Sequence, residues 1–337
     1  IKKSKKQTLR YFIVWGLVVL IYILVLILQK AYPFGSRSFL TYDAYTQYKN
    51  MFHMLFTWLS GEQHGTFLWN MGMGIDAYQE ALYYCLSPFN VIVLAMGEKC
   101  LELSVVILII VKSACIPVTA LYFFRHTNKN RTDNGYPAWL TSFIQITCSL
   151  AYGLCGYALA YGHNIMWLDG LIMLPLIAVS IERLSSGKGT WQYVALLAIT
   201  IVCNFYFALY ICIFALIYFI LENRASWREF WKKSAIFAVT SLIAAMLSGV
   251  VLVPAAYVVM NAAPSVRIIS IPGTIQWGQI GEYISSFYPL KGIRCVELFC
   301  NNSFCGSLVI LLLMMFVTSK SVDIKTRVKY IIAIGVL

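Results

Sequence analysis

The chain has 337 residues, of which 60% are hydrophobic and 12% are charged, and its formal net charge is +12. Soluble domains have roughly 45–50% apolar and about 25% charged residues, so this composition excludes an ordinary soluble globular protein. An aromatic content of 15% also excludes a disordered chain. The composition therefore predicts a polytopic membrane protein.

The apolar segments predict about eight to nine membrane-spanning helices, because one span needs about 20 apolar residues. In chain order they are residues 11–28, 103–124, 136–160, a short segment at 171–181, two arms of a hairpin within 191–221, then 234–260, 304–318 and a last one that begins at Tyr330. The run 191–221 is uncharged but too long for one span, and Asn204 marks its predicted turn. We expect one all-α transmembrane domain over residues 1–337, with a further C-terminal part missing, since the last apolar run has barely begun.

The charge distribution predicts the orientation of this domain, because Lys and Arg collect in cytoplasmic loops. Most of the 26 basic residues fall in segments that the span order places in the cytoplasm, and most of the 14 acidic residues fall outside. The N-terminus is thus expected in the cytoplasm, with two long outer loops at residues 30–102 and 261–303. Basic residues sorted in this way give no single soluble face for a nucleic acid, which we exclude as a partner.

The first outer loop places Asp43 among Tyr42, Gln47 and Tyr48. A carboxylate buried beside aromatic rings can act as a general base for a hydroxyl, because burial raises its pKa. The alternative is an N-cap in an interfacial segment that is rich in tyrosine. A second acid, Asp76, follows two glycines that suit a tight turn. Residues 91–96 are apolar but too short to cross a bilayer, so we expect interfacial or re-entrant helices in this loop.

The turn before the short fourth span carries His163, Asn164 and Asp169. The helix that follows Asp169 is short, so we expect this carboxylate below the outer surface in a water-filled depression, with His163 and Asn164 as its nearest partners. Hydrogen bonding among these groups without catalysis is the alternative. Lys112 lies within the second predicted span, where it can snorkel or pair with an acid.

The second outer loop supplies Arg267, Lys291 and Arg294. Basic side chains near the outer membrane surface suit a phosphate headgroup, although they can equally be solvated charges. A disulfide among the outer cysteines stays open, and their spacing fits no zinc pattern; they are Cys85, Cys100, Cys295, Cys300 and Cys305.

The run from Tyr42 to Tyr48 resembles the D-x-x-x-Q-Y signature of the bacterial YfhO membrane protein family. The resemblance continues through Tyr83-Tyr84, residues 87–90, residues 161–169 and Pro175-Leu176. It implies a helical bundle similar to glycosyltransferases of the GT-C class, which use polyprenyl-phosphate sugars on the outer face of the cell membrane. It also implies that Asp43 is the catalytic carboxylate and that the acceptor is teichoic acid or another surface polymer.

Together these features predict an inverting transfer of a sugar from a polyprenyl-phosphate donor to an acceptor hydroxyl. Asp43 is expected to take the proton, and the basic residues of the second outer loop to hold the phosphate. The other predicted substrate-binding residues are Tyr42, Gln47, Tyr48, Asp76, His163, Asn164 and Asp169. We expect no required cofactor, or a divalent cation such as Mg²⁺ or Mn²⁺ that bridges Asp43 and either Asp76 or Asp169. The alternatives are a transporter or flippase of a lipid-linked sugar, and a non-catalytic assembly subunit.

Overall fold

The computed structural model describes residues 2–62, 65–69, 74–127, 137–223, 226–261 and 307–336. The predicted all-α, polytopic fold is confirmed. The long helices are α1 (Lys2–Leu28), α5 (Leu101–Thr127), α6 (Ala138–Gly153), α8 (Ile165–Ser185), α9 (Thr190–Cys203), α10 (Phe205–Glu222), α11 (Trp227–Leu247), α12 (Gly249–Asn261), α15 (Ser307–Thr318) and α16 (Ile324–Val336). The shorter elements are a π-helix (Ala44–Tyr48), α2 (Lys49–Leu59), α3 (Ala77–Tyr84), a 3₁₀ turn (Pro88–Asn90), α4 (Val91–Met96), a second 3₁₀ turn (Glu98–Cys100) and α7 (Gly156–Ala160).

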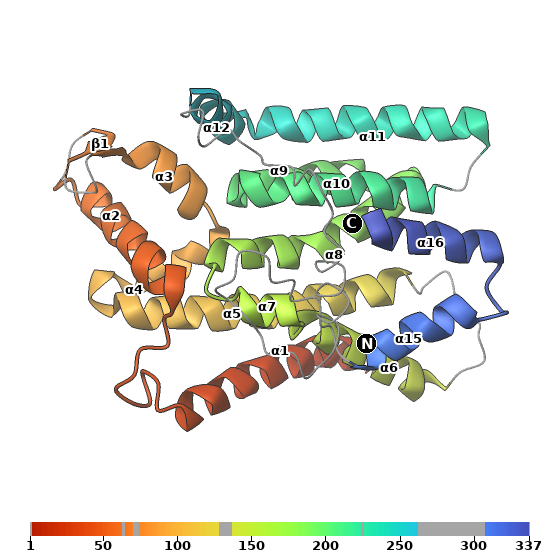
Figure 1. The fold of residues 1–337 in the computed structure, drawn as a ribbon, viewed down its shortest axis with the longest axis horizontal. Coiled ribbons are helices and arrows are strands. Elements are labelled where there is room, and N and C mark those ends of the chain that lie inside the picture. The colour runs from red at the N-terminus through yellow and green to blue at the C-terminus, as the bar shows by residue number, and fades with distance from the viewer. Residues whose placement is uncertain are drawn as a thin grey trace, which may run out of the picture.

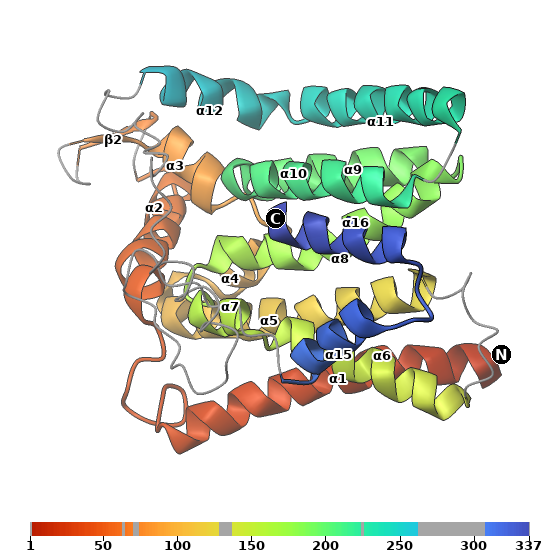
Figure 2. The same ribbon diagram turned by 45° about the vertical axis from the view of Figure 1, so that its right-hand side comes forward.

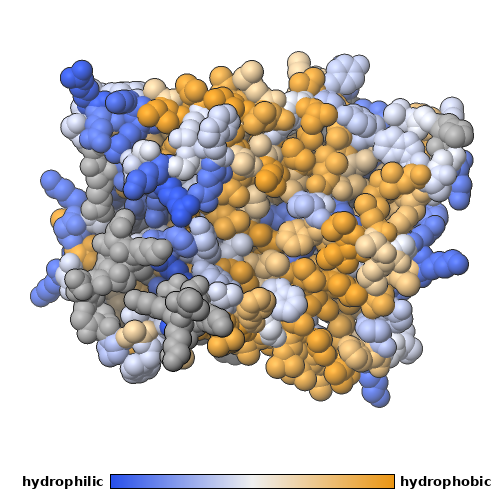
Figure 3. Space-filling view, turned by 180° about the vertical axis from the view of Figure 1, so that it is seen from behind, coloured by the Kyte–Doolittle hydropathy of each residue, from blue (hydrophilic) through white to orange (hydrophobic). Residues whose placement is uncertain are grey.

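Six helices in the described ranges are long and apolar enough to cross a membrane. They are Thr8–Leu28, Glu98–Thr127, Ala138–Ala160, Ile165–Ser185, Phe205–Glu222 and Trp227–Leu247. Three shorter apolar helices are Thr190–Cys203, Gly249–Val258 and Val309–Thr318; the first and last correspond to predicted spans. The single span predicted over residues 234–260 is wrong, because the helix breaks at Ser248 into α11 and α12. The face in Figure 3 is apolar over much of its centre, with hydrophilic residues gathered toward the two ends. This distribution fits a protein embedded in a bilayer.

The long helices lie side by side with their axes roughly aligned (Figures 1 and 2). Helices α2 and α3 stand at one end of this bundle, which we call the Asp43 end. The connection between α15 and α16 lies at the other end. Helices α5 and α8 are the most buried of the six candidate spans, so they form the centre of the bundle.

The predicted hairpin within residues 191–221 is present as α9 and α10. Asn204 alone connects the two helices, with an extended backbone, and its Oδ1 accepts a hydrogen bond of 2.6 Å from the backbone N–H of Phe207. This is a helix N-cap, which satisfies a donor that the first turn of α10 would otherwise leave unpaired. The 14 residues of α9 rise about 21 Å, less than the roughly 30 Å of hydrocarbon, so the turn at Asn204 is sunk below the level of a full span.

The predicted start of the fourth span is wrong. We expected it at residue 171, but α8 begins at Ile165 and continues without interruption to Ser185. The sequence from Ile165 to Leu168 is apolar and adds about one helical turn before Asp169, which places Asp169 inside the helix. Gly170 allows the close approach of α10, because a Cβ at this position would lie 2.0 Å from the Phe207 ring.

The first predicted outer loop has the expected short helices α2 and α4, and also helix α3 and a small sheet that were not predicted. Strands β1 (Phe67–Leu68) and β2 (Ile75–Asp76) are antiparallel, with Phe67 opposite Asp76. Gly74 has a φ of +101° and sits against the Phe67 ring, so both its backbone and its surroundings favour glycine.

Candidate functional site

Asp43 stands at the start of the π-helix, at the end of the bundle where α2 and α3 lie. The residue before it, Tyr42, has a φ of 45°, which is uncommon for a residue other than glycine. Asp43 occupies the N-cap position, yet its side chain makes no capping hydrogen bond. Its half-buried carboxylate has no hydrogen bond or ion pair with any residue that the structure describes. The N-cap alternative therefore does not account for this acid.

Three tyrosines lie within electrostatic reach of Asp43, and we call them the tyrosine wall: Tyr48, Tyr83 and Tyr84. Tyr48 is buried, and its ring meets the ring of Tyr84 edge to face at 5.4 Å. Tyr84 in turn contacts Tyr83 at 4.8 Å. Burial raises the pKa of Tyr84 to about 12, and the charges of Glu80, Tyr83 and Asp43 add to the rise. Burial raises the pKa of Tyr83 as well, so both hydroxyls keep their protons at pH 7.

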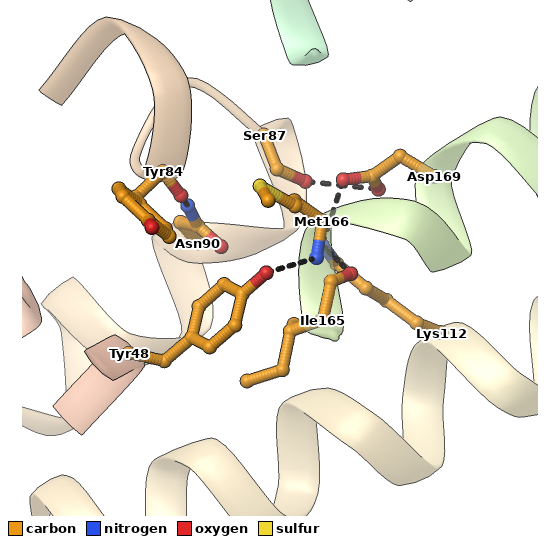
Figure 4. Close-up of polar contacts among 8 residues, drawn as sticks. All are labelled: Tyr48, Tyr84, Ser87, Asn90, Lys112, Ile165, Met166 and Asp169. Atoms are coloured by element: carbon orange, nitrogen blue, oxygen red, sulfur yellow. Dashed lines mark hydrogen bonds and ion pairs between the residues drawn. The ribbon is translucent and has the colours of Figure 1, made fainter. Parts of the chain in front are cut away.

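Two of the predicted site residues, Gln47 and Tyr48, hold this wall in place. The Tyr84 hydroxyl donates a hydrogen bond of 2.9 Å to Oε1 of Gln47. The Tyr48 hydroxyl accepts one of 3.4 Å from the backbone N–H of Met166, at the start of α8 (Figure 4). These bonds connect the π-helix to α3 and to α8, so they fix the segment that carries Asp43.

His163 lies within electrostatic reach of Asp43. Its ring packs against Tyr42, with the ring centroids 5.1 Å apart. Burial lowers the pKa of His163, and the Asp43 carboxylate acts in the opposite direction. His163 is therefore largely neutral at pH 7 and can both donate and accept a hydrogen bond. Its neighbour Asn164 is buried at the N-cap position of α8, without a capping hydrogen bond from its side chain.

A pocket of about 320 Å³, which we call the α1 pocket, adjoins Asp43. Its lining includes both chain neighbours of Asp43, Tyr42 and Ala44, and it includes His163. Polar groups come from Gln29, Ser38 and Thr41, and apolar ones from Ile21, Val25, Ile109, Leu154 and Leu159. The pocket thus runs from polar groups near the carboxylate to apolar side chains along α1.

Asp169 is buried inside the helical bundle, whereas we expected it in a water-filled depression. Its side chain is 4% exposed and forms an ion pair of 2.8 Å with Lys112, which is 1% exposed. Ser87 donates a hydrogen bond of 3.0 Å to the other carboxylate oxygen, and Lys112 also donates to the backbone oxygen of Ile165 (Figure 4). The expected water-filled depression and the expected partners, His163 and Asn164, are therefore wrong for Asp169. The reason is the early start of α8, which turns this carboxylate toward α5.

Asp76 has a structural role in the sheet and in α3. It pairs with Phe67 in the sheet, and its side chain accepts a hydrogen bond of 3.0 Å from the backbone N–H of Tyr78, which caps α3. The divalent cation was expected to bridge Asp43 and either Asp76 or Asp169, of which Asp169 is paired with Lys112 and Asp76 caps α3. In the part of the chain that the structure describes, no group of three or more His, Cys, Asp or Glu could hold a metal ion.

The basic residues expected to hold a phosphate, Arg267, Lys291 and Arg294, lie outside the described residues. The same holds for three of the outer cysteines, while Cys85 and Cys100 are free thiols. Sequence reasoning did not assign Glu80, Tyr83 or Tyr84 to the site. Part of this grouping could have been predicted from the sequence, because residues 80 and 84 lie four positions apart and therefore share one face of a helix.

Comparison with protein families gives one match: a family model described as "Bacterial membrane protein YfhO" matches residues 15–337. A search of curated proteins and a search of solved structures each found no match.

Proposed function

Because this chain belongs to the bacterial YfhO membrane protein family, we propose that it is a membrane glycosyltransferase. It transfers a sugar from a polyprenyl-phosphate donor to a surface polymer such as teichoic acid. The observation that carries this proposal is the half-buried Asp43 carboxylate, which has no partner among the described residues and lies within electrostatic reach of the tyrosine wall and of His163. An unpaired carboxylate in such surroundings is suited to accept a proton.

In the proposed reaction, an acceptor hydroxyl approaches Asp43 and attacks the anomeric carbon of the donor sugar. The new carbon–oxygen bond forms as the bond to the phosphate oxygen breaks, and the configuration at the anomeric carbon inverts. The hydroxyl proton passes to Asp43, and the electron pair of the broken bond leaves with the polyprenyl phosphate. His163, neutral at pH 7, orients the acceptor by a hydrogen bond.

The α1 pocket supports entry of the donor from the lipid. Ile21 lines the pocket and is also 40% exposed on the side of α1, which is among the less buried candidate spans. An isoprenoid chain could therefore lie along this apolar side while its phosphate and sugar reach Ser38, Thr41 and His163. Arg267, Lys291 or Arg294 would bind the phosphate and stabilise the charge of the leaving group.

We further propose that the Asp43 end faces the outside of the bacterial cell membrane and that the N-terminus is cytoplasmic. Arg125 and Arg183 lie in the last turns of α5 and α8, at the helix ends away from Asp43. Cations at these helix ends favour the cytoplasmic side. A donor and an acceptor outside the cell would then both reach the carboxylate.

The test is Asp43→Asn in the native protein in its own cell, with Glu62→Gln as a control that removes an exposed carboxylate from the same end of the bundle. We expect surface-polymer glycosylation to fall by about 10²-fold or more in the first variant and to stay unchanged in the second, with equal amounts of protein in the membrane. Wild-type glycosylation by Asp43→Asn would overturn the proposal. Movement of a sugar lipid across vesicles without any acceptor would instead favour a flippase.

A further inference from the structure

A second pocket, which we call the Glu80 pocket, lies between α3, the start of α10 and α12. Its volume is about 250 Å³, and its lining consists of Gln79, Glu80, Leu82, Tyr83, Tyr84, Phe205, Pro254, Ala255 and Val258. The Tyr83 ring connects its two sides, since it contacts Phe205 at 5.6 Å and Tyr84 at 4.8 Å. Tyr83 and Tyr84 also lie within electrostatic reach of Asp43. The pocket therefore adjoins the same tyrosine wall as the candidate catalytic carboxylate.

Glu80 is the one charged residue in this lining. Its carboxylate is partly buried and has no hydrogen bond or ion pair with the described residues, and burial raises its pKa. An acid in the first turn of a helix stabilises that helix, but an exposed acid would do so equally well. Stabilisation of α3 therefore does not explain why Glu80 is turned into a pocket, where desolvation costs free energy.

The lining chemistry selects a neutral ligand that is rich in hydroxyl groups. A carboxylate accepts hydrogen bonds only, so it suits hydroxyl donors and repels a phosphate, and the lining has no cation to offset that repulsion. The Tyr83, Tyr84 and Phe205 rings offer apolar faces to C–H groups, and the tyrosine hydroxyls offer polar edges. Drug-sized ligands occupy pockets of roughly 300–1,000 Å³, so about 250 Å³ suits a single sugar or a short polyol.

We propose that the Glu80 pocket binds one neutral sugar or polyol unit of the acceptor, with Glu80 accepting hydrogen bonds from its hydroxyls. The assignment to the acceptor rests on the proposed function, whereas the binding of a hydroxyl-rich ligand does not. The two pockets then divide the substrates. The α1 pocket takes the lipid-linked donor and the Glu80 pocket takes the acceptor. The chain neighbours of Asp43 line the first pocket, and Tyr83 and Tyr84, within electrostatic reach of Asp43, line the second.

The test measures binding directly, by saturation-transfer NMR on the purified full chain in detergent, with ribitol and methyl α-glucoside as probes and glycerol phosphate as an anionic comparison. Wild-type protein should bind a neutral probe in preference to the phosphate. Glu80→Gln should raise the dissociation constant about tenfold, because it replaces charge-assisted hydrogen bonds with neutral ones. The matched control, Glu62→Gln, should bind like the wild type.

A second variant guards against misfolding of the first. Val258→Phe fills the pocket from α12 and leaves Glu80 unchanged, so it should also weaken binding of the neutral probe. Equal binding by Glu80→Gln and wild type, or no binding of either neutral probe to the wild type, would overturn the proposal. Asp43→Asn should retain binding while it loses glycosylation. If it retains both, the catalytic role of Asp43 fails while the pocket assignment stands.

Discussion

Lys112 on α5 and Asp169 on α8 form a buried ion pair of 2.8 Å between the two central helices of the bundle. Ser87, in the segment that leads into α4, completes the arrangement by its hydrogen bond to Asp169. The ion pair therefore joins the bundle core to the segment that follows the tyrosine wall. Both charged groups are buried and have lost their hydration, so the free-energy cost of burying each charge is offset mainly by its attraction to the other.

We predict that Lys112→Met lowers stability by about 3–5 kcal/mol, because it leaves Asp169 charged and unpaired in the core. The double variant Lys112→Met/Asp169→Leu should recover much of this loss, since neither charge then remains. Thermal melting of the three proteins in one detergent measures both effects. A double variant that is less stable than the Lys112→Met protein would mean that the pair is not the cause of the loss.

The sequence predicted those features that depend on local composition. The hairpin turn at Asn204 followed from an uncharged run too long for one span, and the cap from Asn204 to Phe207 shows why the break falls there. The short helix α4 followed from an apolar run too short to cross a bilayer. Hydrophobicity and length decide such elements, and both can be read along the chain.

Contacts between distant segments could not be predicted in this way. Lys112 and Asp169 are 57 positions apart, and nothing local indicates that α5 and α8 turn these side chains toward each other. The residues around Asp43 also include some that could be predicted from the sequence and some that could not. Tyr42 and Tyr48 were expected from their position in the chain, whereas Tyr83 and Tyr84 reach the site only through the packing of α3.

Gly170 and Phe207 provide a test of packing near the sunk turn. A Cβ at residue 170 would lie 2.0 Å from the Phe207 ring, so Gly170→Ala should cost about 1–3 kcal/mol by overpacking. Phe207→Leu in the same protein should relieve part of the loss, because it removes the clashing ring atoms. The melting temperatures of the single and double variants show how strongly the effects of the two substitutions on stability depend on each other. Additive losses would show that the two side chains do not meet.

The Tyr84–Gln47 hydrogen bond should matter for activity as well as stability. Tyr84→Phe removes the donor to Gln47 Oε1 and should cost about 0.5–1.5 kcal/mol. It should also reduce glycosylation, because Gln47 belongs to the π-helix that follows Asp43. The matched control is Tyr45→Phe, since Tyr45 is 52% exposed and its hydroxyl has no partner among the described residues. If both variants reduce glycosylation equally, the hydrogen bond does not position the site.

The pKa of His163 should report directly on its distance from Asp43. In the folded protein, burial lowers the pKa of His163 from its ordinary value of 6.5 and the Asp43 charge partly offsets that shift. Asp43→Asn removes the offset, so the pKa should fall further. NMR titration of ring-labelled histidine measures it, with the His163 signal identified by its loss in His163→Gln. An unchanged or higher pKa in Asp43→Asn would mean that the two side chains are not neighbours.

The same shift predicts a pH dependence of stability. Because the folded pKa of His163 lies below the unfolded value, the unfolded chain binds more protons between the two values, and stability must rise with pH through this window. Above about pH 6.5 the contribution is constant. His163→Gln should flatten the acidic side of the melting profile, and Asp43→Asn should make it steeper, because the folded pKa is then lower still. If the slope falls in His163→Gln and rises in Asp43→Asn, the carboxylate and the imidazole interact electrostatically, as expected if both contact one acceptor hydroxyl.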